Sequence, residues 1–399
     1  MRSNAVILTV LLLFSLLDAK EEGGLAYLNT LRQKSGLIPL QENRLLNKAA
    51  ASHANYLISN QKLGHLEHQE NRGYTGKTPA ERAVYHGYFS KDVMENIAVN
   101  AKSGTEAIDD LFAAIYHRFV FLNFEKDQIG VGRALADRSK RLKNAYVYNL
   151  GSSKLNVLCK KTFIPVSGNL YLKDVCINRD ALIPQSLYEK KEKEIKSRNT
   201  KVVLHPYPGQ KEVKPAFYNE EPDPLPDYDV SGYPVSVQFN DRYYHSIELK
   251  SFRLFDDQNR EITMYRILKH ANDPHQRLKK TEFALMPTKR LEYATTYRAE
   301  FEAVVDGEPY QRSWEFATKR FKEKLYRIAK QTTRIDALPG STLILYFVPR
   351  SPHDVLKNYR VTQGLKVSFI DHNTLKVTLP KKIQKEMKLK AGRNIVIFE

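Results

Sequence analysis

The amino-acid sequence predicts a multidomain chain, an α+β domain followed by an all-β region. Its 399 residues exceed the roughly 100–200 residues of one ordinary domain. Apolar residues recur three and four positions apart before residue 150, and they alternate with polar residues after residue 228. A composition of 42% hydrophobic and 27% charged residues is typical of globular proteins and excludes a disordered chain.

Residues 1–19 have the pattern of a signal peptide. Arg2 precedes an apolar run from Ala5 to Leu17, and Ala19 supplies a small residue for cleavage. At about 13 residues this run is too short for a typical membrane-spanning helix, although an uncleaved anchor is the alternative interpretation. We therefore expect a secreted or periplasmic protein. A mean hydropathy of −0.50 excludes a protein with many membrane spans.

Residues 20–155 carry the helical signals. A first helix is predicted around Leu25–Leu31, a second after Asn43, and a third after the capping box formed by Ser103 and Glu106. The segments 128–135 and 145–152 then alternate as strands do. Helices and strands in this order predict an α+β domain.

Residues 156–184 contain both cysteines of the chain, Cys159 and Cys176. In an exported protein they are expected to form a disulfide that closes a loop of about 16 residues. Alternation around a central Val-Ser-Gly-Asn stretch favours a β-hairpin here. Two unpaired buried thiols are the alternative.

Three further segments complete the predicted organisation. Residues 185–227 are charged and then proline-rich, which predicts a semi-rigid linker. Residues 228–318 hold five alternating segments separated by turn residues, as an all-β sandwich requires, with Trp314 in its core. Residues 319–399 continue with apolar β-like runs, which form either a small β-rich domain or an extension of the sandwich.

Charge is concentrated at the C-terminal end. The whole chain has a net charge of +18, and residues 319–399 contribute 18 Lys and Arg against 6 Asp and Glu, or +12. A basic domain indicates an anionic partner. For an exported protein we expect an acidic lipid or another anionic component of the cell envelope, and not nucleic acid; a merely soluble basic surface is the alternative. No oligomeric state is predicted.

Three polar residues of the first domain could carry chemistry. His65 follows the second helix, Glu95 lies in the segment MENIAV, and His117 lies near the end of the third helix. Two imidazoles and a carboxylate could bind zinc or another divalent metal, or act as acid and base. Alternatively, His117 stabilises a helix C-terminus and Glu95 is a buried hydrogen-bonding group.

The order of motifs in this domain resembles the CAP superfamily of cysteine-rich secretory, antigen 5 and pathogenesis-related proteins, and its bacterial secreted branch most. The resemblance runs from Leu25 to Gly151 through the stretch LNTLRQKSGL, the block GH…YTGKTPAERA…HGY, MENIAV, and YHR followed by LNF…IGVG. It implies a three-layer α-β-α sandwich around an antiparallel sheet.

The resemblance also implies a cavity lined by two histidines and two acids. His65 and His117 match the histidines, which would be the metal ligands, and Glu95 matches the Glu of the family's G-E-N-I motif, with Met94 in place of its glycine. The second acid has no counterpart between residues 111 and 116, and Glu67 is the substitute we consider. The implied ligand-binding set is therefore His65, Glu67, Glu95 and His117.

Residues 228–318 resemble the immunoglobulin-like modules that follow bacterial CAP domains, through VSGYPVSVQFN and SWEFAT. The family resemblance favours a binding or interaction protein of the cell envelope, with a lipid or surface polymer as ligand, over an enzyme. A metal-dependent hydrolase, acting on peptides or the cell wall through His65, Glu95 and His117, is the alternative. A structural adhesive protein with a vestigial cavity is a third possibility. No Ser-His-Asp order, phosphate-binding glycine loop or H-E-x-x-H motif is present.

Overall fold

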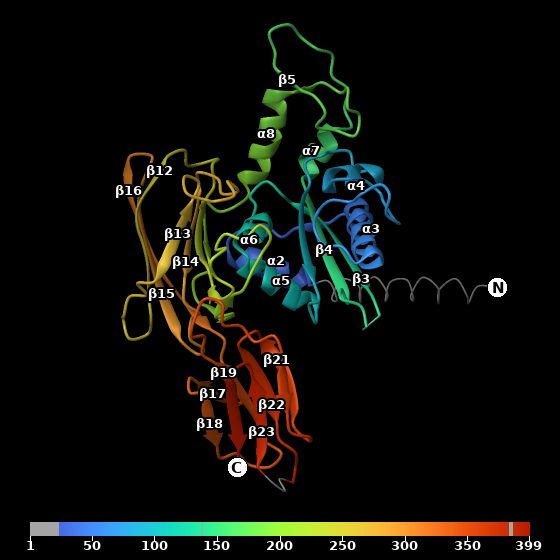
Figure 1. The fold of residues 1–399 in the computed structure, drawn as a ribbon. Coiled ribbons are helices and arrows are strands. Elements are labelled where there is room, and N and C mark those ends of the chain that lie inside the picture. The colour runs from blue at the N-terminus through green and yellow to red at the C-terminus, as the bar shows by residue number, and fades with distance from the viewer. Residues whose placement is uncertain (1–23, 138, 383–385) are drawn as a thin grey trace, which may run out of the picture.

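The computed structural model describes residues 24–137, 139–382 and 386–399. The predicted signal peptide, residues 1–19, lies outside the described residues. Figure 1 shows an α/β part beside a β-sandwich, with a second β part below them that carries the C-terminus. No helix in the described ranges is long and apolar enough to cross a membrane.

The first part is a three-layer sandwich built on a four-stranded sheet. The sheet has the order β1 (Gln41–Glu42), β3 (Gln128–Leu135), β4 (Asn144–Gly151), β2 (Met94–Val99). β1 pairs with β3 in parallel and the other pairs are antiparallel, so the expected antiparallel sheet has one parallel edge. Helices α3 (Arg44–Asn60) and α4 (Pro79–Tyr85) lie on one face, and α2 (Leu25–Lys34), α5 (Gly104–Ala113) and α6 (Ile115–Phe121) pack on the other.

Capping side chains begin these helices where the sequence predicts. The Asn43 side chain accepts hydrogen bonds from the backbone N–H groups of Leu45 and Leu46, and the Ser103 hydroxyl accepts one from Glu106. The predicted third helix is in fact two, because the extended backbone of Ala114 (ψ 114°) separates α5 from α6. Helix α6 has no capping side chain of its own.

The segment 156–184 was predicted as a disulfide-closed hairpin, and only the disulfide is confirmed. Cys159 and Cys176 are bonded, with 5.4 Å between their Cα atoms. The expected first strand is wrong because Ser152 caps the short helix α7 (Ser153–Leu158). The only strands here are β5 (Tyr171–Leu172) and β6 (Ile183–Pro184), which pair with each other and leave residues 160–170 as a loop.

The predicted linker, residues 185–227, is not an extended spacer in the structure. It contains helix α8 (Gln185–Lys196) and the strands β7 (Val202–His205), β8 (Gln210–Val213) and β9 (Ala216–Phe217). β7 and β8 are edge strands of the two sandwich sheets, so the sandwich begins before residue 228. The prolines lie at strand ends and between the strands, where no ladder hydrogen bond is lost.

The sandwich consists of the sheets β13-β14-β11-β7 and β12-β15-β16-β8, beside the small pair β10-β9. The two sheets share one core that contains Trp314, whose indole N–H donates to the Pro206 carbonyl at 2.9 Å. The other strands of this part are β10 (Ser231–Gly232), β11 (Val235–Phe239), β12 (Ile247–Phe255), β13 (Tyr265–Lys269), β14 (Glu282–Pro287), β15 (Thr296–Val305) and β16 (Glu308–Thr318).

Residues 319–399 form a separate β-rich domain with its own core. Its sheets are β17-β19-β22-β21 and β18-β24-β23-β20, and their buried side chains form one cluster without sandwich residues. The strands are β17 (Lys324–Ile328), β18 (Thr332–Ile335), β19 (Thr342–Phe347), β20 (Tyr359–Val361), β21 (Lys366–Asp371), β22 (Thr374–Thr378), β23 (Met387–Ala391) and β24 (Asn394–Phe398).

The first part and the sandwich share buried contacts, which positions the site. Residues Ala114, Ile115, Tyr116 and Phe119 of the α5–α6 region pack against Phe217, Leu225, Leu268, Leu278, Ala284 and Met286. The Arg118 guanidinium, fully buried, lies 4.8 Å from the Tyr233 ring centre and donates to the Pro234 carbonyl at 2.8 Å. Helix α6 is therefore held between the two parts.

Candidate functional site

The structure brings His65, Glu95 and His117 together at one cavity of about 380 Å³. His65 lies on the loop between α3 and α4, Glu95 on β2 and His117 on α6. The two imidazole rings are stacked, with their centres 6.4 Å apart. The structure therefore places these three residues at the same cavity.

Glu95 is held by groups of its own domain. The Arg82 guanidinium donates to both carboxylate oxygens at 2.8 Å, and His65 Nδ1 donates to Oε1 at 3.0 Å. The Asn149 amide, in the orientation in which its oxygen accepts from the Ala50 N–H, donates to Oε2 at 2.9 Å. Burial would raise the pKa of the Glu95 carboxyl, but the His65 hydrogen bond and the Arg82 charge outweigh it, so this pKa lies below its ordinary value.

Glu67 is not the second acid of the cavity. It is 1% exposed and is absent from the cavity lining. Its carboxylate accepts from His53 Nδ1 at 2.8 Å and from the Thr75 backbone N–H at 2.8 Å. The suggestion that Glu67 supplies this acid is wrong because its position, two residues after His65, turns it into the domain interior.

The acid that contacts His117 is Glu220, which sequence reasoning missed. His117 Nδ1 donates to its Oε2 at 2.8 Å. The same carboxylate accepts from the backbone N–H groups of Tyr116 (3.2 Å) and His117 (3.4 Å), the second and third residues of α6. Glu220 thus caps the helix that Ala114 leaves uncapped. No sequence signal indicated Glu220, because the break at Ala114 that creates this helix start was not predicted.

Part of the cavity lining comes from the sandwich side. Glu221, Pro222, Arg277, Lys279 and Glu282 line it. Arg277 is exposed and has no ion pair among the described residues, whereas Lys279 lies 3.3 Å from the Glu125 carboxylate. Met94, Phe119 and Val120 supply apolar lining from the first part. The cavity therefore has an apolar wall beside a cation.

Glu282 is a second carboxyl that the sequence did not indicate. It is 4% exposed and accepts from the Lys279 backbone N–H at 2.8 Å and the Gln238 amide at 3.1 Å. Burial raises the pKa of Glu282 to about 7, against the opposing effect of these hydrogen bonds and of Lys279. This carboxyl can therefore exchange a proton near neutral pH.

A resident metal does not fit this set of residues. Each imidazole directs Nδ1 to a carboxylate, which is the arrangement that metal-binding histidines show. Within the described ranges, neither Nε2 atom makes a hydrogen bond. However, no group of three His, Cys, Asp or Glu in the described part of the chain could hold a metal ion. Glu95 is engaged by Arg82, so only two ligands remain, fewer than zinc sites in proteins use.

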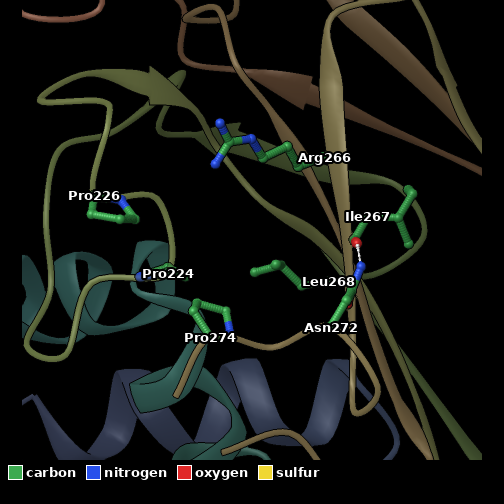
Figure 2. A pocket seen from close by; sticks show the side chains of 7 residues that line it. All are labelled: Pro224, Pro226, Arg266, Ile267, Leu268, Asn272 and Pro274. Atoms are coloured by element: carbon green, nitrogen blue, oxygen red, sulfur yellow. Dashed lines mark hydrogen bonds between the residues drawn. The ribbon is translucent and has the colours of Figure 1, made fainter. Parts of the chain in front are cut away.

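Figure 2 shows another pocket, of about 370 Å³, which none of the predicted residues lines. It lies between the prolines Pro224, Pro226 and Pro274 and strand β13. Its Arg266 pairs with Asp227 at 3.0 Å and lies over the Tyr228 ring, while Asn272 donates to the Ile267 carbonyl at 2.8 Å. Its polar groups are satisfied internally.

Comparison with known proteins identifies the first part. Residues 25–150 match the CAP family model, described as the cysteine-rich secretory protein family. No curated protein matches the chain. The resemblance stated from the sequence is confirmed for this part of the chain.

Two solved structures illustrate the likeness. One is an extracellular protein of Bacillus anthracis that contains an SCP domain, with 21% identity and a TM-score of 0.27 over 32% of this chain and 38% of that one. The other is an outer surface protein of Borrelia burgdorferi, with 21% identity and a TM-score of 0.28 over 32% of this chain and 88% of that one. The chain thus spans about two fifths of the first protein. Likenesses of this strength carry no conclusion about ligands.

Proposed function

We propose that this chain, whose residues 25–150 form a domain of the CAP family, is an extracytoplasmic binding protein of the cell envelope that holds a lipid or a segment of surface polymer in the cavity between its CAP domain and its β-sandwich. We take the sandwich to be immunoglobulin-like, on the basis of its two sheets and its buried tryptophan. The Cys159–Cys176 disulfide supports a location outside the cytoplasm.

The observation that carries binding over catalysis is the engagement of the carboxylates. Glu95 accepts from Arg82 and His65, and Glu220 accepts from His117 and the start of α6. A general base must be able to reach the proton that it removes. These two acids instead orient histidines, so the imidazole nitrogens and Arg277 are among the groups that can face a ligand.

The cavity lining selects an amphipathic ligand. Met94, Phe119 and Val120 favour aliphatic or sugar-ring carbon, and the Nε2 atoms of His65 and His117, whose Nδ1–H groups donate to carboxylates, can accept hydrogen bonds from hydroxyl groups. Arg277, which is exposed and has no ion pair within the described part of the chain, favours an anionic group. A phospholipid or an anionic polymer segment has both parts.

The test is to purify the full chain from an exporting host, extract it with organic solvent and identify co-purified molecules by mass spectrometry. Arg277→Glu should lower the recovered amount at least about tenfold, since one charge-assisted contact contributes about 1.5–3 kcal/mol and its reversal adds repulsion. Lys280→Glu, an exposed neighbour outside the cavity lining, is the control. Equal recovery from both variants, or no bound or bindable molecule, contradicts the proposal.

One observation favours a hydrolase as the second candidate. Glu282 lines the same cavity and its pKa is raised to about 7, which suits a group that gives and takes protons at neutral pH. On this reading Glu282 acts without a resident metal. Release of fragments from peptide or wall substrates, lost in Glu282→Gln and retained with chelator present, would establish the hydrolase and overturn the binding proposal.

A further inference from the structure

The loop that the disulfide closes, residues 160–175, carries several aliphatic side chains that are largely exposed to solvent. Ile164 is 87% exposed, Leu170 72% and Val166 59%, and Val157 on the adjoining helix α7 is 53% exposed. In Figure 1 this loop projects from the end of the molecule above β5 and α8. None of its residues lines the cavity. Clustered exposed apolar side chains mark an interaction surface.

The base of this loop is fixed to the body of the protein. Cys159 and Cys176 lie in a buried cluster with Leu155, Leu158 and Ile183. The backbone of Leu170 accepts from the Gln185 N–H at 3.0 Å, and Ile177 N–H donates to the Phe89 carbonyl at 2.7 Å. The loop is therefore anchored at its base, where its two ends join the body of the protein.

Positive charge outweighs negative charge in this loop. Residues 160–175 contain Lys160, Lys161 and Lys173 against one acid, Asp174, which pairs with Lys91. Lys160 and Lys161 are exposed and make no ion pair within the described ranges, and Lys173 pairs with Asp180 at 3.2 Å. The loop therefore presents both aliphatic side chains and the lysines Lys160 and Lys161 to solvent.

We infer that this loop docks on the surface of an anionic lipid membrane, with Ile164, Val166 and Leu170 in the interface and Lys160 and Lys161 against the head groups. Aliphatic side chains gain from leaving water, and lysines near the surface are attracted to acidic lipids. Protein interfaces are instead enriched in Trp, Tyr and Arg and depleted in Lys, which argues against a protein partner. The inference goes beyond the proposed function because it needs neither the cavity nor its ligand.

The probe is co-sedimentation of the full chain with vesicles of phosphatidylcholine alone or mixed with phosphatidylglycerol. Wild type should bind the mixed vesicles, more weakly at high salt, and bind pure phosphatidylcholine little. The double change Ile164→Asp and Leu170→Asp should reduce binding at least about tenfold, because two apolar contacts are lost and two negative charges added. Leu338→Asp, at an equally exposed leucine of the C-terminal domain, is the matched control and should bind like wild type.

The lysines are tested separately. Lys160→Ser with Lys161→Ser should lower binding to the mixed vesicles about tenfold or more, since each lysine contributes roughly a fivefold effect. Lys381→Ser with Lys382→Ser, exposed lysines elsewhere, should have a smaller effect. No vesicle binding, or full binding by the Asp variant, overturns the inference. So does self-association in ultracentrifugation that the Asp variant abolishes without any vesicle binding, since the loop would then be a protein interface.

Discussion

The imidazole of His117 donates to the carboxylate of Glu220 at 2.8 Å, although 103 positions separate the two residues. Glu220 comes from the segment between strands β9 and β10, outside the matched CAP region. Its carboxylate also caps α6 by accepting from the backbone N–H groups of Tyr116 and His117. The orientation of one cavity histidine therefore depends on a residue of the downstream β region.

Gly132 should tolerate no side chain. A Cβ built there would lie 2.2 Å from the Ala50 carbonyl carbon of α3, so the helix would have to move away from β3. Gly132→Ala should lower the free energy of unfolding of the CAP domain by about 3 kcal/mol or more. Gly87→Ala, at a glycine with open space around it and φ +89°, should cost about 1 kcal/mol. Urea denaturation followed by circular dichroism measures both, and equal losses would contradict the close packing.

Because of Glu282, the free energy of unfolding should fall as pH rises. Its pKa in the folded protein is raised by burial to about 7 from an ordinary value of 4.5, so the native state binds more protons between these pH values than the unfolded state does. The stabilisation is complete below about pH 4.5 and is lost by about pH 7, to a total of about 3 kcal/mol. Glu282→Gln should remove this decline. Parallel declines of wild type and variant in chemical denaturation across pH would show that the carboxyl is not perturbed.

Trypsin should cleave first after Lys160 or Lys161. Both lie in an exposed loop, whereas the proline-rich part of residues 185–227 contributes strands and buried side chains such as Phe217 and Leu225. The expectation of a linker would have placed the first cut after residue 185. Fragment masses from a short digest distinguish the two, and early cleavage between residues 202 and 227 would contradict the observed packing.

Zinc should bind weakly and not survive dialysis. His65 and His117 each have Nε2 free of hydrogen bonds within the described ranges, but no third ligand joins them. Metal analysis of dialysed protein should therefore show far less than one zinc per chain. His65→Ala should lower what uptake remains without a measurable change in melting temperature. Stoichiometric zinc in dialysed protein would mean that a third ligand exists.

Local patterns explain what could be predicted from the sequence. The caps at Asn43 and Ser103 begin helices where expected, because a cap depends on residues two or three positions away. His65, Glu95 and His117 could be matched through motifs that surround each of them. The disulfide pairing could be predicted because the chain has only two cysteines.

The missed residues depend on contacts between distant segments. Glu220 lies in a proline-rich stretch whose composition predicts a spacer, and its role requires α6 to pack against the sandwich. Glu282 belongs to a strand whose sequence predicts ordinary core, and its raised pKa, caused mainly by burial, depends on packing between distant segments. Glu67 was favoured by its proximity to His65, yet the turn between them directs it to His53. Such outcomes follow from packing, which local periodicity does not encode.

The central claim is that the cavity binds a ligand and that Glu220, from the β region, orients the cavity residue His117. The most direct measurement is calorimetric titration of the molecule recovered from wild-type protein into wild type, Glu220→Gln and Glu220→Ala, with melting temperatures as a check on folding. Glu220→Ala should weaken binding at least about tenfold, and Glu220→Gln, which keeps an acceptor for His117 and α6, should weaken it less. Unchanged affinity in folded Glu220→Ala protein would contradict the claim.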